Sequence, residues 1–222
     1  MANSADLRRR RLLQAATVLP VLGWSRVQAQ PAPRWPAWKV LVDSSLSRDG
    51  RMIDRSQQDQ RSTSEGQSYA LFFALVDNDQ AVFDRILGWT QDNLAGGDMG
   101  KRLPAWLWGR DDAGAWRVLD DNPASDSDLW LAYALLEGAR LWRRPALKAI
   151  AEGMLAQVRA REIVDLPGLG PMLLPGPQGF IEGDATRVNP SYLPLPLLRR
   201  FAAEDRSGPW QALARNSVQL LQ

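Results

Sequence analysis

The sequence predicts an all-α fold in which the helices form two layers. Residues 66–76 and 128–142 are apolar at most positions, which is typical of helices buried on most sides. Residues 81–94 and 146–164 instead place apolar side chains three and four positions apart, with polar residues between them. This second pattern predicts half-exposed helices. Their alternation along the chain indicates inner helices covered by outer ones.

The remaining elements are indicated by proline and glycine. Residues 36–46 form a short amphipathic stretch, and residues 190–203 and 209–221 each begin with a proline, which is favoured in the first turn of a helix. Two segments are predicted as long loops. Residues 98–121 contain three tryptophans, and residues 165–187 are rich in glycine and proline, with room for a short hairpin.

Composition restricts the chemistry that the chain can perform. A length of 222 residues predicts one domain, or at most two. Cysteine and histidine are both absent, which excludes disulfides, thiolate or imidazole metal sites, cysteine nucleophiles and Ser-His-Asp catalysis. Carboxylates, hydroxyls, amides, lysine and arginine remain. Ten tryptophans are present, a residue type that fills cores but also stacks on flat ligands such as sugar rings.

Residues 1–29 are predicted to be an export signal peptide. A run of four arginines from Arg8 precedes an apolar stretch, and Val27 and Ala29 form a small-x-small cleavage site. The arginine run resembles a twin-arginine signal. The apolar stretch is too short for a stable membrane anchor. We therefore expect a periplasmic or secreted protein.

The charge of the remaining chain argues against nucleic-acid binding. Five of the 27 basic residues and one of the 25 acidic residues lie in the first 29 positions, which leaves 22 basic against 24 acidic. Without a net positive charge, binding to a phosphate backbone has no electrostatic support. Neither a metal nor a cofactor is expected, because good ligands are lacking.

A carboxylate stands at the start of each inner helix. Glu65 follows Ser64 directly before the first one, where Ser64 and Gln67 also fit a capping box. Asp126 stands before the second, where Ser125 and Asp128 are box-like too. Capping is the structural reading of both motifs. If the two helices are neighbours, however, both carboxylates face one basin, and paired carboxylates are the machinery of glycoside hydrolysis.

Several motifs together resemble glycoside hydrolase family 8. Residues 64–69 resemble the acid motif of that family and residues 124–136 resemble its signature. Within the family, the resemblance is greatest to the endoglucanases of bacterial cellulose-synthase operons, and it runs from Trp35 to the end of the chain. Further matching segments are 35–38, 102–109, 167–176 and 189–193. The departures are Ala70, Ser127, Leu131 and Gly138, none of which removes a carboxylate.

The resemblance implies an (α/α)6 barrel that hydrolyses internal β-1,4 bonds of cellulose with inversion. Glu65 would be the proton donor, and Asp126 would stabilise the distorted sugar or the developing positive charge. Substrate-binding roles are implied for Tyr69, Trp106, Trp108, Asp128 and Tyr192, with plain core packing as the alternative for each aromatic residue. The implied partners are β-1,4-glucan chains and the cellulose synthase and export complex.

The general base that inversion requires is not found in the sequence. In the family this base is an aspartate well downstream of the Asn-Pro-Ser-Tyr segment. In this sequence the only acidic residues after Tyr192 are Glu204 and Asp205. We therefore expect residues 30–222 to be an incomplete catalytic domain, the N-terminal half to two-thirds of the barrel, with apolar faces of inner helices left exposed. The alternatives are a non-catalytic glucan-binding remnant and a helical scaffold. The lack of a repeat period argues against the scaffold.

Overall fold

The computed structural model of the protein describes residues 35–220, so the predicted signal peptide lies outside the described residues. The α-helices of this part are α2 (Pro36–Ser45), α3 (Ser64–Val76), α4 (Gln80–Leu94), α5 (Ser125–Trp142), α6 (Pro145–Arg161), α7 (Leu195–Glu204) and α8 (Trp210–Gln219), with a short 3-10 helix η1 (Pro190–Tyr192). The strands are β1 (Ser62–Thr63), β2 (Leu107–Arg110), β3 (Trp116–Asp120), β4 (Ile163–Leu166), β5 (Gly170–Leu173), β6 (Ile181–Glu182) and β7 (Ala185–Thr186).

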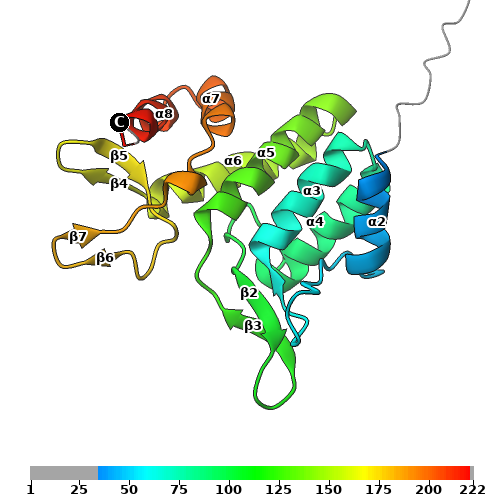
Figure 1. Ribbon diagram of the computed structural model, residues 1–222. Coiled ribbons are helices and arrows are strands. Elements are labelled where there is room, and N and C mark those ends of the chain that lie inside the picture. Colours follow the sequence, from blue (N-terminus) through cyan, green and yellow to red (C-terminus); the bar gives the residue numbers. More distant parts are fainter. Residues whose placement is uncertain (1–34, 221–222) are drawn as a thin grey trace, which may run out of the picture. The chain divides into compact units, whose positions relative to one another are not determined.

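The helices pack in two rows. One row contains α3, α5 and α7, in which α5 contacts both α3 and α7 (Figure 1). In the other row, α4 packs against α3, α6 against α5 and α8 against α7. Helices α3 and α5 contribute mostly buried residues to the core, among them Leu71, Leu129 and Leu135. The predicted alternation of inner and outer helices is confirmed for this part of the chain.

The start of α3 differs from the predicted capping box. Thr63 is the cap, and its hydroxyl accepts a hydrogen bond from the Gly66 amide at 3.1 Å, while Ser64 is already helical. Gln67 does not reach back to the cap. Its side chain is buried and donates to the Thr90 hydroxyl of α4 at 2.8 Å. The prediction was wrong because Gln67 finds a partner on the neighbouring helix.

The start of α5 differs in the same way. The helix begins at Ser125, three residues before the predicted position, and Ala124 occupies the cap without a side-chain hydrogen bond. The Ser125 amide donates instead to the carbonyl of Pro175 at 3.0 Å. The capping role predicted for Ser125 and Asp128 is therefore wrong, because a distant segment satisfies the backbone at this end.

The two predicted loops contain antiparallel hairpins. Strands β2 and β3 lie within 98–121 and form a three-stranded sheet with β1, while β4–β5 and β6–β7 are separate two-stranded hairpins in the second segment (Figure 1). Helix α6 ends at Arg161, earlier than predicted, because the next residues pair with β5 as strand β4. The predicted helix 190–203 is divided into η1 and α7 at Pro194, which lacks an amide hydrogen.

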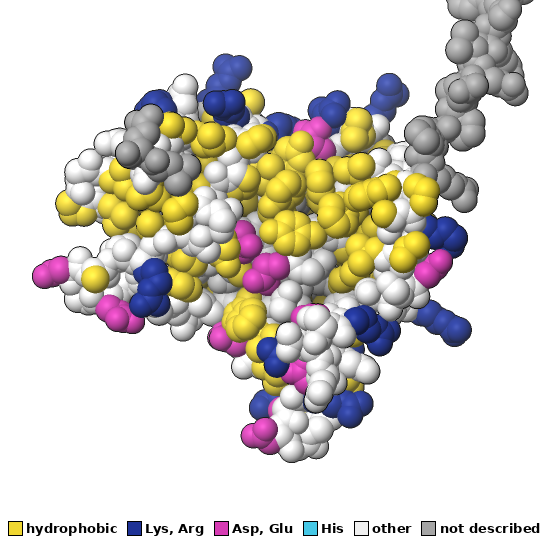
Figure 2. All heavy atoms as spheres, viewed as in Figure 1, with side chains coloured by type: hydrophobic (Ala, Val, Ile, Leu, Met, Phe, Trp, Pro, Cys, Tyr) yellow, Lys and Arg dark blue, Asp and Glu magenta, His cyan; other side chains and the backbone are white. Residues whose placement is uncertain are grey.

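Hydrophobic side chains gather on one face over α3 and α5 (Figure 2). Exposed large hydrophobic residues of these two helices include Tyr69 and Val76 of α3 and Leu141 of α5, as expected from the apolar pattern of both helices. No helix within residues 35–220 is long and apolar enough to cross a membrane.

Candidate active site

The first turns of α3 and α5 lie side by side. The Ser127 hydroxyl of α5 donates to the Ser64 hydroxyl of α3 at 2.7 Å, and both side chains are buried. The Ser64 amide in turn donates to the carbonyl of Trp106 at 3.0 Å. These contacts place Glu65 and Asp126, which follow and precede the bonded serines, at the same end of the helix pair.

The surroundings of Glu65 favour the protonated form of its carboxyl group. Burial raises its pKa above the ordinary value, although hydrogen bonds from its own amide and from the Ser64 and Thr63 side chains act in the opposite direction. The Ser64 hydroxyl donates to Glu65 Oε2 at 3.3 Å. A shift in this direction is the one that a carboxyl group needs to serve as a general acid.

Asp126 is the second carboxyl group of the site, and only 7% of the residue is exposed. Burial is the main cause that raises its pKa to about 6, and the negative charge of Glu65 adds to it. Hydrogen bonds from the backbone amides of Ser127 and of Asp126 itself oppose this rise. Two carboxyl groups with such surroundings interact, so the proton held by one affects the ionisation of the other.

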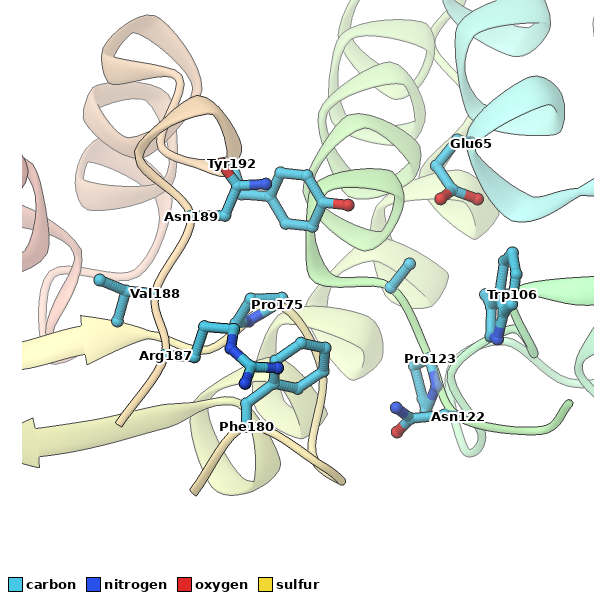
Figure 3. Close-up of a pocket in the computed structure, with 11 residues that line it drawn as sticks. Glu65, Trp106, Asn122, Pro123, Pro175, Phe180, Arg187, Val188, Asn189 and Tyr192 are labelled. Atoms are coloured by element: carbon cyan, nitrogen blue, oxygen red, sulfur yellow. The ribbon is translucent and has the colours of Figure 1, made fainter. Parts of the chain in front are cut away.

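An open pocket of about 390 Å³ lies beside these helix ends. Glu65 and Trp106 lie on one side of it, and Phe180 and Arg187 lie opposite (Figure 3). The full lining is Glu65, Trp106, Asn122, Pro123, Ala124, Pro175, Phe180, Arg187, Val188, Asn189 and Tyr192. A carboxyl group, an aromatic wall and several polar groups therefore meet in one concave surface.

Both predicted tyrosines lie close to the carboxyl groups. Tyr192 lines the pocket with its hydroxyl turned toward Glu65 (Figure 3), and the Asn189 side chain caps the 3-10 turn that carries it. Tyr69 lies one helical turn after Glu65 on α3. Burial raises the pKa of both tyrosines, and the charges of Asp126 and Glu65 raise them further. The structure thus brings both side chains near the two carboxyl groups, but only Tyr192 lines the pocket.

The two predicted tryptophans are placed differently from each other. Trp106 lines the pocket. Trp108 does not, because its ring stacks on Trp116 at 4.7 Å and meets Trp89 edge-on at 5.2 Å. The Arg51 guanidinium lies 4.3 Å from the Trp108 ring centroid. Trp108 therefore packs between the β2–β3 hairpin and α4, as the core-packing alternative expects.

Asp128 is also absent from the pocket lining. It has no exposed surface, and its carboxyl group faces that of Glu162 at the end of α6. A direct contact with substrate, as the resemblance implied, is therefore not what the structure shows for Asp128. Glu162 gave no signal in the sequence, because it lies in an amphipathic helix pattern without a motif.

Several lining residues were not predicted from the sequence. Phe180 and Arg187 flank the β6–β7 hairpin, and Pro175 follows β5, all within the segment 165–187 that was predicted as a long loop. Asn122 donates to the Gln178 carbonyl at 3.1 Å and so ties two loop segments together. Within the described part of the chain, no group of three or more acidic side chains is placed to hold a metal ion.

We expect Glu65→Gln to lower the pKa of Asp126 below its value of about 6, because the variant removes a neighbouring negative charge. The pKa should stay above 3.8, since burial remains. Titration of the Asp126 carboxyl carbon by NMR measures this shift, with Glu152→Gln on the exposed face of α6 as the control. An unchanged pKa would show that the two groups do not interact.

Comparisons with known proteins agree on one family. The model of glycosyl hydrolases family 8 matches residues 13–222. An endoglucanase of Xanthomonas axonopodis pv. citri is 55% identical over 96% of this chain and 56% of its own length. An endoglucanase of Escherichia coli O157:H7 is 49% identical over 86% of this chain and 52% of its own length. The chain thus spans about half the length of the curated relatives it matches.

Solved structures show the same likeness. The endo-1,4-D-glucanase of Vibrio fischeri superposes with a TM-score of 0.81 at 44% identity, over 84% of this chain and 54% of that one. A family 8 endoglucanase of Klebsiella pneumoniae gives a TM-score of 0.77 at 29% identity, over 84% and 58%. These neighbours are (α/α)6 barrels, and the described helices correspond to part of such a barrel, which confirms the predicted fold class.

Proposed function

The chain belongs to glycosyl hydrolases family 8, and from this premise we propose that the protein is an endo-β-1,4-glucanase that hydrolyses internal bonds of cellulose chains with inversion. The observation that carries the proposal is the closeness of Glu65 and Asp126 on the first turns of two adjacent helices, beside a pocket that Glu65 lines and Asp126 does not.

The chemistry divides between these two carboxyl groups. Glu65 lines the pocket and protonates the leaving glycosidic oxygen, because burial favours its protonated form. Asp126, when ionised, stabilises the positive charge that develops on the sugar ring in the oxocarbenium-like transition state. Because its pKa is raised to about 6, this role requires a pH above that value.

Aromatic and polar side chains bind the sugar. Trp106 and Phe180 offer faces on which glucose rings stack, and Tyr192 offers a hydroxyl toward the reacting centre. Arg187 is exposed beside Phe180 and can donate hydrogen bonds to sugar hydroxyls. An open pocket is compatible with a substrate longer than the pocket itself, as an internal segment of a polymer is.

One observation favours a second candidate function. Inversion needs a general base on the face of the sugar opposite the acid. Of the residues that line the pocket in the described part of the chain, Glu65 is the only carboxylate, and we assign no residue to this step. A module that binds β-1,4-glucan without cleaving it is therefore the alternative.

Hydrolysis of carboxymethyl-cellulose separates the two functions. An endoglucanase releases reducing ends and quickly lowers the viscosity of the solution, and NMR of a short oligosaccharide digest shows the inverted anomer first. A glucan-binding module instead co-sediments with amorphous cellulose and releases no sugar. Release of reducing ends only from xylan or starch would contradict the proposed substrate.

We also propose that the protein is exported and acts beside the cellulose synthase and export complex. The leader should be removed after Ala29, since the arginine run, the apolar stretch and the small residues at the site form a complete signal. Intact-mass measurement of the exported protein tests this cleavage. A retained leader, or a start within the apolar stretch, would contradict it.

A further inference from the structure

Asp128 and Glu162 form a fully buried pair of carboxyl groups. Both residues are 0% exposed, Asp128 in the first turn of α5 and Glu162 at the end of α6. The two carboxyl groups lie close enough for one to donate a hydrogen bond to the other if it keeps its proton. No other residue in the described part of the chain donates to any of their four oxygens. A buried carboxyl group without other donors is costly, so this pair needs an explanation.

Backbone hydrogen bonds join the end of α6, which carries Glu162, to the first turn of α5, which carries Asp126 and Asp128. The Leu174 amide donates to the Glu162 carbonyl at 2.8 Å, and the Ser125 amide donates to the carbonyl of Pro175 at 3.0 Å. Two consecutive residues after β5 thus join the end of α6 to the start of α5. Asp126 lies in that same turn of α5, so a bond that fixes Asp128 also fixes the backbone that carries Asp126.

Two facing carboxyl groups cannot both be ionised in a buried site. Burial is the main cause that raises the pKa of Asp128, and the charges of Glu162, Asp126 and Glu65 raise it further. Burial also raises the pKa of Glu162 to about 8, with the Arg161 cation acting in the opposite direction. At neutral pH the pair therefore retains at least one proton.

We propose that Asp128 and Glu162 share a proton and that the bonded pair positions Asp126 in the active site. The inference rests on the proposed function for the role of Asp126. Asp128 and Glu162 have no exposed surface, whereas Asp126 is partly exposed, so both act through Asp126 and not on the substrate. When the shared proton leaves at alkaline pH, Asp128 and Glu162 both carry a negative charge and the hydrogen bond between them is lost. The first turn of α5 is then no longer held in place by this pair.

The proton of the pair can be detected through stability. A carboxyl group whose pKa is higher in the folded protein than in the unfolded chain stabilises the fold fully below the unfolded value, and this stability is lost as pH rises through the folded value. For Glu162 this range runs from 4.5 to about 8. In Asp128→Asn and Glu162→Gln an amide replaces the shared proton as the donor, so this loss of stability should shrink.

Urea unfolding of the full chain at several pH values between 5 and 9 measures this effect. We expect the free energy of unfolding to fall less steeply with pH in Asp128→Asn and in Glu162→Gln than in the wild type, by up to the slope of one proton. Glu152→Gln, an exposed change on the same helix, should keep the wild-type slope. If the free energy of unfolding falls with pH as steeply in both pair variants as in the wild type, the proposal of a shared proton is wrong.

A measurement that leaves the pair unchanged covers the case in which the pair variants fail to fold. In Glu65→Gln, where Glu65 contributes no carboxyl proton, the infrared carbonyl band of a protonated carboxyl group should be present at pH 7 and should disappear as the pair loses its proton at alkaline pH. If no such band exists at pH 7, both carboxyl groups are ionised and the proposal is wrong. Neither this measurement nor the unfolding series depends on glucanase activity.

The positioning role is tested by kinetics on a soluble glucan. Asp128→Ala should lower kcat by about 10- to 100-fold with little change in KM, because it displaces Asp126 without altering the pocket lining. Asp128→Asn keeps the bond, so it should restore kcat and extend activity to higher pH. Equal kcat in wild type and Asp128→Ala would overturn the positioning role. If the wild type is also inactive on the glucan, this counts against the proposed function. The pH dependence of the free energy of unfolding still tests whether Asp128 and Glu162 share a proton.

Discussion

Glu65→Gln is expected to lower the rate of β-1,4-glucan hydrolysis by about 10²- to 10⁴-fold, the usual contribution of general acid catalysis. The amide keeps the shape of the side chain and can still accept from the Ser64 hydroxyl. It has no acidic proton to give to the leaving oxygen. The change should therefore act mainly on kcat, with KM for the glucan nearly unchanged.

Reducing-end release from carboxymethyl-cellulose measures this effect in the active protein. The matched control is Glu152→Gln, which makes the same chemical change at an exposed position of α6. Because a substrate with a good leaving group needs less protonation, an activated aryl glucoside should lose less activity in Glu65→Gln than cellulose does. Wild-type rates on cellulose would show that Glu65 is only an acid in the first turn of a helix.

Trp210→Ala is expected to destabilise the protein by about 3–5 kcal/mol, the usual cost of removing a buried tryptophan. Trp210 begins α8 and is fully buried against Phe201 of α7, with ring centroids 5.2 Å apart at 62°. Its indole nitrogen donates to Asp205 Oδ2 at 2.9 Å. Removal of the ring leaves a cavity at the α7–α8 contact.

Chemical unfolding followed by circular dichroism tests this prediction. Trp210→Phe should cost less, since a ring still fills the site and Asp205 keeps hydrogen bonds from Arg159 and Ser207. Gln211→Ala, at the exposed next position, should change stability by less than about 0.5 kcal/mol. Equal unfolding midpoints for Trp210→Ala and wild type would mean that the α7–α8 contact does not depend on this ring.

The inner and outer helices were predictable because hydrophobic periodicity is a local property of the chain. The apolar stretches became α3 and α5, and the amphipathic ones became α4 and α6. The positions of Glu65 and Asp126 at helix starts were predictable for the same reason. Their chemical role was inferred from the resemblance of the surrounding motifs, and it remains a proposal.

The helix ends were less predictable, because partners far away in the sequence decide them. Gln67 bonds to α4 and not to its own helix start, and Ser125 is satisfied by the carbonyl of Pro175. Strands β2–β3 and β4–β5 form in predicted loops because each gains a ladder of hydrogen bonds from its partner. A local pattern of residues does not contain that partner.

The sequence by itself determined which stretches form buried helices and that carboxyl groups stand at their starts, because composition and periodicity are properties of neighbouring positions. Only the tertiary structure decided how they meet. It brought Ser64 to Ser127, moved Trp108 into a stack with Trp116, and buried Asp128 against Glu162. The physical reason is that pKa values and packing depend on which groups surround a side chain, and those groups come from distant parts of the chain.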